Sequence, residues 1–197
     1  MTETSIYGTH TDEMTDALDD ILHRIDDLRL RIMRDKGTDP IEHCRSRIKS
    51  EESMREKCRR LGYPETEESA LKLIHDAIGI RIVCAFLSDV YLIRNYLAAF
   101  DDLELIKEKD YIRNAKPNGY RSYHMIVRSA SGYYVEIQLR TISMDTWAAL
   151  EHHMKYKQSL KGNIALIESE LKRCADELAS TDVSMQAIRD MIFEAQQ

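Results

Sequence analysis

Two adjacent segments, residues 121–128 and 133–141, constrain the fold of this chain most strongly, because polar side chains recur in them at every second position. Successive side chains of a β-strand point to opposite faces, so this period of two predicts two strands. The sequence Ser-Ala-Ser-Gly between them suits a hairpin turn. In the second segment the polar residues are Glu136, Gln138 and Arg140. We expect a hairpin whose polar face can serve as a ligand platform unless a helix covers it.

A cationic turn precedes this hairpin. Pro117, Asn118 and Gly119 form the turn, with Lys116 just before it and Tyr120 just after it. Together with the polar strand residues, the turn offers a lysine, an aromatic ring, a histidine and a carboxylate. This mixture suits a polyphosphate and a base bound side by side.

The rest of the chain alternates between helical and strand patterns. Apolar residues at steps of three and four predict helices, at residues 14–32, 50–61, 67–75, 89–100, 143–157 and 163–195, the last interrupted at 180–182. Apolar or β-branched runs predict strands, at residues 79–86, 103–109, 121–128 and 133–141. Ser50 and Ser88 are expected as helix N-caps, and residues 41–50 as a lead-in to the second helix. The order predicts a mixed α+β fold with a helical arm at each end.

Composition narrows the function. The 197 residues favour one domain, or a core with helical extensions. The chain has a net charge of −6, whereas most nucleic-acid-binding proteins carry a strongly basic surface. An anionic ligand would therefore need a local cationic pocket. No apolar run approaches a membrane span, which argues against a membrane partner. The four cysteines have no zinc spacing, which favours reduced thiols and a cytoplasmic protein.

Cationic residues cluster in two further places. Arg47 and Lys49 stand just before the second helix, and Ser53 and Lys57 share one face of it. A helix N-terminus also favours anions, although a solvated charged face would explain the same residues. Arg81 lies inside a buried strand, where burial of a charge requires either a structural salt bridge or a ligand contact.

Two carboxylates occupy strand positions among these cations. Asp76 directly precedes the strand at 79–86, and Glu136 lies within the strand at 133–141. Mg²⁺ is commonly held by one or two carboxylates together with phosphate oxygens and water. Cations around such a site would neutralise a triphosphate and the charge that develops during phosphoryl transfer.

These residues resemble the motifs of the RelA/SpoT-type alarmone synthetase domain. The matching patterns are Arg47-x-Lys49-x-x-x-Ser53-x-x-x-Lys57, Asp76-x-x-Gly-x-Arg81, Lys116-Pro-Asn-Gly-Tyr-x-Ser-x-His124 and Glu136-x-Gln-x-Arg-Thr141. The match covers about residues 41–157, between an N-terminal helical extension at 1–40 and a C-terminal one at 158–197. The chain is therefore similar to a stand-alone small alarmone synthetase.

The resemblance implies a nucleotidyltransferase-like fold with a mixed sheet of about five strands, and transfer of the β,γ-pyrophosphate of ATP to the 3′-hydroxyl of GDP or GTP. It implies Arg47 and Arg81 beside the adenine, with Lys49, Ser53 and Lys57 on the ATP phosphates. Asp76 and Glu136 would bind Mg²⁺, and Glu136 would also activate the acceptor hydroxyl. Tyr120 would stack on guanine and Asn118 would read its edge. Lys116 and His124 would engage acceptor phosphates, with Gln138 and Arg140 in support.

Other interpretations remain open. Some relatives resemble toxins that pyrophosphorylate the tRNA 3′ end or adenosine nucleotides, and a catalytically silent nucleotide-binding or RNA-binding regulator is a third reading. His75-Asp76 is also found in metal phosphohydrolases, but that chemistry needs further ligands in a separate helical domain, so we expect no hydrolase activity. Family resemblance further suggests a homotetramer built through the helical arms, and regulation by an alarmone or single-stranded RNA.

Overall fold

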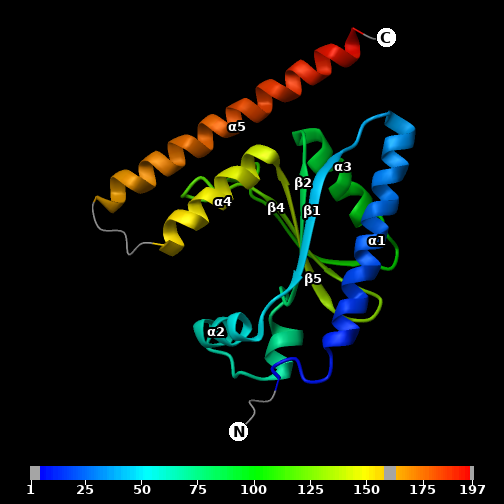
Figure 1. The fold of residues 1–197 in the computed structure, drawn as a ribbon, viewed down its shortest axis with the longest axis vertical. Coiled ribbons are helices and arrows are strands. Elements are labelled where there is room, and N and C mark those ends of the chain that lie inside the picture. The colour runs from blue at the N-terminus through cyan, green and yellow to red at the C-terminus, as the bar shows by residue number, and fades with distance from the viewer. Residues whose placement is uncertain (1–4, 158–162, 196–197) are drawn as a thin grey trace.

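The computed structural model describes residues 5–157 and 163–195 and is built around a mixed five-stranded sheet (Figure 1). The spatial order of the strands is β1-β2-β5-β4-β3. Their bounds are β1 Ile41–Ile48, β2 Ile78–Cys84, β3 Glu104–Asp110, β4 Tyr123–Arg128 and β5 Tyr134–Thr141. β2 and β5 pair in parallel, and the other neighbours pair antiparallel. The predicted α+β architecture with about five strands is confirmed.

The apolar face of the sheet is covered by two helices, α1 (Thr11–Lys36) and α3 (Leu87–Ala98) (Figure 1). Ile78, Ile80 and Ile82 of β2 point into this layer and are almost fully buried. α1 contributes Met14, Ile21, Ile25 and Ile32 to the same core, at the helical spacing read from the sequence. The N-terminal helix therefore packs on the sheet as part of its single hydrophobic core.

The opposite face is only partly covered. α2 (Glu51–Leu61), the short π-helix η1 (Ser69–Leu73) and α4 (Ile142–Lys157) flank it, with α2 and α4 toward opposite ends of the sheet (Figure 1). α2 begins at the predicted cap, because the Ser50 side chain accepts a hydrogen bond from the Ser53 amide. The polar residues of β5 lie between these two flanking helices.

α5 (Ile164–Glu194) runs along α4 and then past the end of the sheet (Figure 1). Ala175 and Asp182 are buried, and the Trp147 indole donates a hydrogen bond to the Leu171 carbonyl at 2.8 Å. Much of its predicted apolar seam stays exposed, at Ile164, Met185, Ile188 and Ile192. In the part of the chain that the structure describes, the apolar seam of α1 lies in the core of the sheet, whereas much of that of α5 is exposed. No helix within residues 5–157 and 163–195 is long and apolar enough to cross a membrane.

Three sequence predictions of local structure are wrong. Residues 41–48, expected to lead into a helix, form the edge strand β1. Ser88 does not cap α3. The helix begins at Leu87, and its N-cap residue, Phe86, makes no side-chain capping hydrogen bond. The expected break at residues 180–182 is absent: α5 continues through them, and the Thr181 hydroxyl donates to the Glu177 carbonyl at 3.0 Å.

Candidate functional site

The register of the sheet aligns the polar side chains in two rows across its open face. The first row runs through Arg47, Gly79, Glu136, Ile126 and Lys107. The second row runs through Arg45, Arg81, Gln138, His124 and Lys109. Positions that are distant in sequence therefore converge because paired strands place them side by side.

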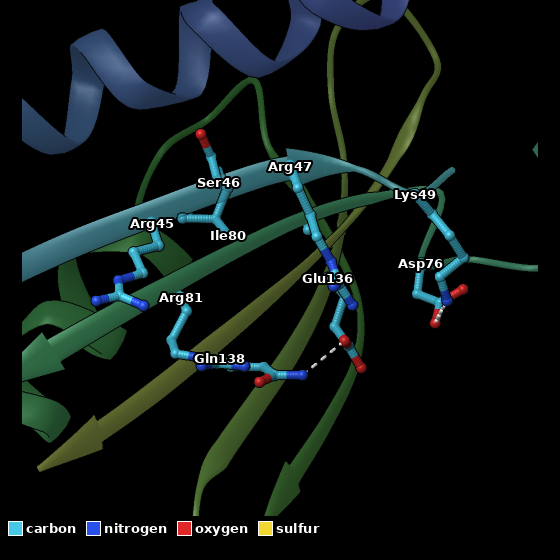
Figure 2. A pocket seen from close by; sticks show the side chains of 10 residues that line it. Arg45, Ser46, Arg47, Lys49, Asp76, Ile80, Arg81, Glu136 and Gln138 are labelled. Carbon is cyan, nitrogen blue, oxygen red and sulfur yellow. Dashed lines mark hydrogen bonds and ion pairs between the residues drawn. The ribbon is translucent and has the colours of Figure 1, made fainter. Parts of the chain in front are cut away.

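A first cavity of about 280 Å³ lies over β1, β2 and β5 (Figure 2). Arg47, Lys49 and Arg81 give it positive walls. Gly79 lines its floor without a side chain, so the backbone there leaves room for a ligand. Burial, and then the charge of Arg140, lower the pKa of Arg81, and its Nε is buried with no partner among the described residues. The Arg81 Nε is thus a donor that a bound base or anion would satisfy.

A second cavity of about 370 Å³ lies next to the first, over β3, β4 and β5. Lys57, Lys116 and His124 line it, as the sequence suggested for a phosphate-binding region. Lys107 and Lys109 of β3 also line it and were not singled out from the sequence. Their alternation along a charged strand was the available signal, because every second residue of β3 faces this side. The second cavity is therefore more cationic than the motifs alone predict.

Asp76 and Glu136 line both cavities and stand where the two meet. The Asp76 Oδ2 atom accepts hydrogen bonds from Lys49 Nζ at 2.6 Å and from Lys57 Nζ at 2.5 Å. Its other oxygen, Oδ1, is buried with no partner among the described residues. Burial lowers the pKa of Lys49, and the contact with Asp76 opposes that shift.

Glu136 is held ionised by its neighbours. Burial alone would raise the pKa of its carboxyl, but hydrogen bonds and charge from His124, with Gln138 and Lys57, lower the pKa to about 2. His124 Nδ1 lies 3.4 Å from Oε1, and Gln138 Nε2 donates to Oε2 at 2.8 Å. At neutral pH this side chain is a partly buried carboxylate that can accept a hydrogen bond or bind a cation.

The two carboxylates fit a magnesium ion chemically. Mg²⁺ takes oxygen ligands, often one or two carboxylates, and completes its shell with phosphate oxygens and water. The partnerless Oδ1 of Asp76 and the ionised Glu136 supply such oxygens. Within the described residues, no group of three or more His, Cys, Asp or Glu side chains could hold a metal by itself. An ion here would therefore depend on the substrate for part of its shell.

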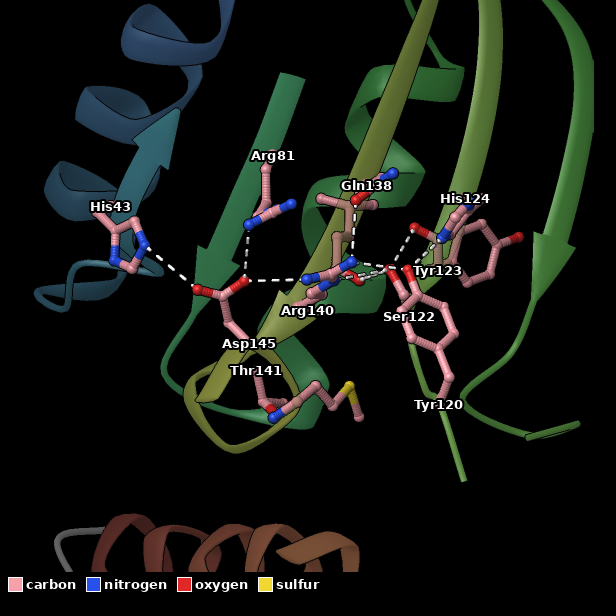
Figure 3. A network of polar contacts seen from close by, with 12 residues as sticks. His43, Arg81, Tyr120, Ser122, Tyr123, His124, Gln138, Arg140, Thr141 and Asp145 are labelled. Atoms are coloured by element: carbon pink, nitrogen blue, oxygen red, sulfur yellow. Dashed lines mark hydrogen bonds and ion pairs between the residues drawn. The ribbon is translucent and has the colours of Figure 1, made fainter. Parts of the chain in front are cut away.

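Gln138, which donates to Glu136, belongs to a network of polar contacts that extends to Asp145 at the start of α4 (Figure 3). Arg140 is 4% exposed and donates to Asp145 Oδ1 at 3.0 Å, to the Tyr120 hydroxyl at 2.7 Å and to Gln138 Oε1 at 3.0 Å. Asp145 Oδ1 also accepts from Arg81 Nη1 at 3.3 Å. Asp145 was missed from the sequence, where an aspartate in the first turn of a helix is ordinarily explained by the helix dipole.

The cationic turn is fixed against α5. Gly119 has φ of 90°, and a Cβ atom there would lie 2.6 Å from that of Ala175. Arg121 donates to the Ala175 carbonyl at 3.3 Å and to Asp176 at 2.9 Å. Asn118 closes the turn by accepting from the Tyr120 amide at 3.2 Å. The C-terminal helix thus sets the position of the loop that carries Lys116 and Tyr120.

The structure brings most of the predicted site residues together. Those that line one or both cavities are Arg47, Lys49, Lys57, Asp76, Arg81, Lys116, His124, Glu136 and Gln138. Four predicted residues line neither: Ser53, Asn118, Tyr120 and Arg140. Tyr120 and Arg140 reach the site through hydrogen bonds, Tyr120 to His124 Nε2 at 2.8 Å. Ser53 contacts Ser50 at the α2 N-terminus, 2.9 Å between their hydroxyl oxygens.

Comparison with known proteins gives consistent matches. Residues 46–161 match the family described as the region found in RelA/SpoT proteins. The chain is 43% identical to the GTP pyrophosphokinase YwaC of Bacillus subtilis over 78% of this chain and 76% of that protein. Its fold resembles that of small alarmone synthetase 1 of Bacillus subtilis bound to its product pppGpp, with a TM-score of 0.79, 31% identity and coverage of 91% and 94%. A GTP pyrophosphokinase family protein from Streptococcus pneumoniae matches with a TM-score of 0.81, 32% identity and coverage of 94% and 93%.

Proposed function

The chain belongs to the RelA/SpoT family, and from this membership we propose that it is a GTP pyrophosphokinase with a nucleotidyltransferase-like core. It transfers the β,γ-pyrophosphate of ATP to the 3′-hydroxyl of GDP or GTP and thereby makes ppGpp or pppGpp, the alarmones of the stringent response. The observation that carries the proposal is the pair of adjacent cavities with Asp76 and Glu136 at their junction. A reaction between two nucleotides needs two subsites that open onto one reactive centre.

The first cavity suits the donor ATP. Arg47 and Arg81 offer planar guanidinium groups, which stack on a base as well as pair with anions. Lys49 contacts Asp76 at the border between the two cavities. Its ammonium group can bind a phosphate chain that runs from the first cavity toward this border. Lys57 lies across the junction in the second cavity and can meet the far end of the same chain. The α2 N-terminus, which carries Ser53, adds amide donors for phosphate.

The second cavity suits the acceptor. Lys107, Lys109 and Lys116 provide the positive charge that a 5′-di- or triphosphate needs. The Lys116 ammonium lies 4.8 Å from the ring centroids of both Tyr111 and Tyr120, so aromatic surface stands beside the phosphate-binding charge. We assign Tyr120 to guanine stacking and Asn118 to recognition of the guanine edge. Both roles require the turn that carries these residues to contact the bound base.

The reaction forms one bond and breaks one bond. The 3′-oxygen of the acceptor attacks the β-phosphorus of ATP, the bond from that phosphorus to the α,β-bridging oxygen breaks, and AMP leaves with the bonding electrons. Glu136 accepts a hydrogen bond from the attacking hydroxyl and orients it, and the proton that this hydroxyl loses as the new P–O bond forms passes by way of the carboxylate to water. Its pKa of about 2 makes it a weak base in isolation, so the main effect of the carboxylate is to align the hydroxyl and stabilise its developing charge.

We propose Mg²⁺ as the cofactor, held by Asp76 and Glu136 together with substrate phosphates. A bound magnesium ion supplies charge neutralisation on the transferred pyrophosphoryl group. Lys49 and Lys57, which both contact Asp76 Oδ2, offset phosphate charge from the protein side. Arg81 and the lysines of the second cavity keep the two nucleotides in place while the transfer occurs.

The direct test incubates purified protein with [γ-³²P]ATP and, in separate reactions, with GDP, GTP, AMP, ADP or tRNA. We expect label to move to GDP or GTP, release of AMP in equal amount, and no transfer by Glu136→Gln. Label that appears only on tRNA or on adenosine nucleotides would reject the proposal in favour of a related pyrophosphokinase. Absence of all transfer, with nucleotide binding retained, would instead support a silent regulator.

Addition of ppGpp, pppGpp or single-stranded RNA to the same assay tests regulation.

We also propose a cytoplasmic homo-oligomer, with a tetramer favoured. The exposed apolar residues of α5 support this, including Ile188, Met191 and Ile192, each about half exposed or more. Light scattering of the purified protein, compared with a variant carrying Ile188→Glu and Ile192→Glu, measures the assembly. A monomeric wild-type protein would contradict it.

A further inference from the structure

The carboxylate of Asp145 lies outside both cavities but is connected to residues of each through hydrogen bonds. Asp145, in the first turn of α4, is 15% exposed at its side chain and lines neither cavity. Its Oδ1 atom accepts from Arg81 of the first cavity at 3.3 Å and from Arg140 at 3.0 Å (Figure 3). Two arginines that would repel each other are thereby held together, since the charge of Arg140 lowers the pKa of Arg81 and the charge of Asp145 opposes this.

From Arg140, two arms reach the two oxygens of Glu136. In the short arm, Arg140 donates to Gln138 Oε1 at 3.0 Å, and Gln138 Nε2 donates to Glu136 Oε2 at 2.8 Å. This arm fixes the orientation of the glutamine amide, because its oxygen must face the arginine and its nitrogen the carboxylate.

In the long arm, Arg140 donates to the Tyr120 hydroxyl, which contacts His124 Nε2, and His124 Nδ1 lies beside Glu136 Oε1. Arginine has donors only, so the tyrosine oxygen accepts from it and the tyrosine hydrogen goes to Nε2. In the neutral imidazole, Nε2 is then the acceptor, so the ring proton resides on Nδ1, directed at Glu136. The order of donors and acceptors runs one way from Arg140 to the carboxylate.

We propose that Asp145 is a positioning residue for pyrophosphate transfer. It anchors Arg140, and through Arg140 it fixes the side-chain orientation of Glu136 and the Nδ1–H tautomer of His124, while it holds Arg81 against the first cavity. One side chain thus positions both Arg81 of the first cavity and the carboxylate of Glu136. The effect on turnover rests on the proposed function, whereas the effect on the His124 tautomer does not.

The kinetic test compares Asp145→Asn with wild type. We expect kcat to fall about tenfold or more, as for other residues that orient a reacting group, and KM for ATP to rise because Arg81 loses its anchor. Asp89→Asn is the matched control: Asp89 is 3% exposed and pairs with Arg189 at 2.8 Å, outside both cavities. It should lower stability at least as much as Asp145→Asn and leave kcat of the folded fraction unchanged.

A double-mutant cycle identifies the route. Tyr120→Phe removes the hydroxyl that relays the effect of Arg140, so Asp145→Asn and Tyr120→Phe should be non-additive in kcat. Fully additive losses, or a loss in Asp145→Asn no larger than in Asp89→Asn, would overturn the positioning role.

A spectroscopic arm is independent of catalysis. The imidazole ¹⁵N signals of His124 are assigned by their loss in His124→Gln and are measured at a pH where the ring is neutral. They should report a proton on Nδ1 in wild type and a tautomer mixture in Asp145→Asn. An Nε2–H form in wild type, or no change in the variant, would refute the proposal even for an active enzyme. If wild type transfers no pyrophosphate but shows this tautomer shift, the proposed function fails and the positioning network stands.

Discussion

Gly79 on β2 lies directly opposite Glu136 on β5 in the parallel register of the sheet. Arg47 of β1 pairs with Gly79 from the other side, so the Glu136 carboxylate and an arginine of the first cavity are separated by a residue without a side chain. A Cβ atom on Gly79 would meet only the Arg47 carbonyl oxygen, at 4.0 Å. Backbone packing therefore does not require a glycine at this position, and the missing side chain leaves space in the first cavity.

Substitution of Gly79 should impair ATP use without unfolding the protein. We expect Gly79→Val to raise KM for ATP about tenfold or more, because its methyl groups occupy the floor of the first cavity, and Gly79→Ala to have a smaller effect. β-branched residues are favourable in strands, so the melting temperature should stay close to that of wild type. Steady-state kinetics with varied ATP measures this. An unchanged KM in Gly79→Val would contradict the assignment of ATP to this cavity.

Glu136 should also make stability depend on acid pH. Its pKa falls from an ordinary 4.5 to about 2 in the fold, so it stabilises the native state above pH 4.5, by on the order of 3 kcal/mol. This contribution is lost as the pH falls from about 4.5 through about 2. Urea unfolding of wild type and Glu136→Gln across this window should show a free-energy difference that shrinks toward acid pH. Parallel pH profiles for the two proteins would show that the shift is absent.

Chelation should remove synthesis and Mg²⁺ should restore it. Asp76→Asn should require about tenfold more Mg²⁺ for half-maximal activity, because a neutral amide replaces a charged ligand. Asp39→Asn is the control, since Asp39 pairs with Arg29 and lines neither cavity. Full activity of the wild type in excess EDTA would contradict the cofactor proposal.

Two substitutions of Tyr120 should separate the contribution of its aromatic ring from that of its hydroxyl group. Tyr120→Ala loses the ring, and we expect KM for GTP or GDP to rise about tenfold or more, with less effect on KM for ATP, since stacking on a base contributes about 1–3 kcal/mol. Tyr120→Phe keeps the ring and loses the hydroxyl, so it should lower kcat more than it raises KM. Equal effects on both nucleotides in Tyr120→Ala would argue against guanine stacking.

Gly119 and Gly132 form a matched pair for testing the role of α5. Both have positive φ, 90° and 92°, so alanine costs backbone strain at either site. Only at Gly119 does the new Cβ clash, at 2.6 Å from Ala175 Cβ, whereas Gly132 has nothing within 4 Å. Gly119→Ala should therefore lose about 1–3 kcal/mol more stability in thermal or urea unfolding and raise KM for GTP. Equal losses would show that α5 does not constrain the turn.

The sequence predicted the elements whose side-chain pattern follows their own geometry. The alternation in residues 133–141 assigned Glu136, Gln138 and Arg140 to one face, and the structure places them there. Ser50 was identified as a cap because capping is a local contact. The motif patterns located nine of the predicted residues in the two cavities.

The failures are residues whose role depends on distant partners. β1 is an edge strand with mostly polar residues, so no alternation marked it. The Ser88 amide bonds to Gln186 Oε1 at 3.0 Å, a partner on α5 that no local pattern reveals. Asp182, expected in a helix break, is buried and accepts from Thr141 Oγ1 at 2.6 Å. Asp145 was missed for the same reason, because Arg81 contacts it from 64 residues away.

The central place of β5 in the sheet has a consequence for how the protein matures. β5 is last in sequence among the strands and lies between β2 and β4. Until residue 141 has emerged from the ribosome, β1 with β2 and β3 with β4 are separate two-stranded ribbons with open inner edges, which are marginally stable alone. Docking of β5 joins the ribbons and delivers Glu136 in the same step. A chain that ends before Glu136 therefore lacks both the strand that joins the two ribbons and this carboxylate.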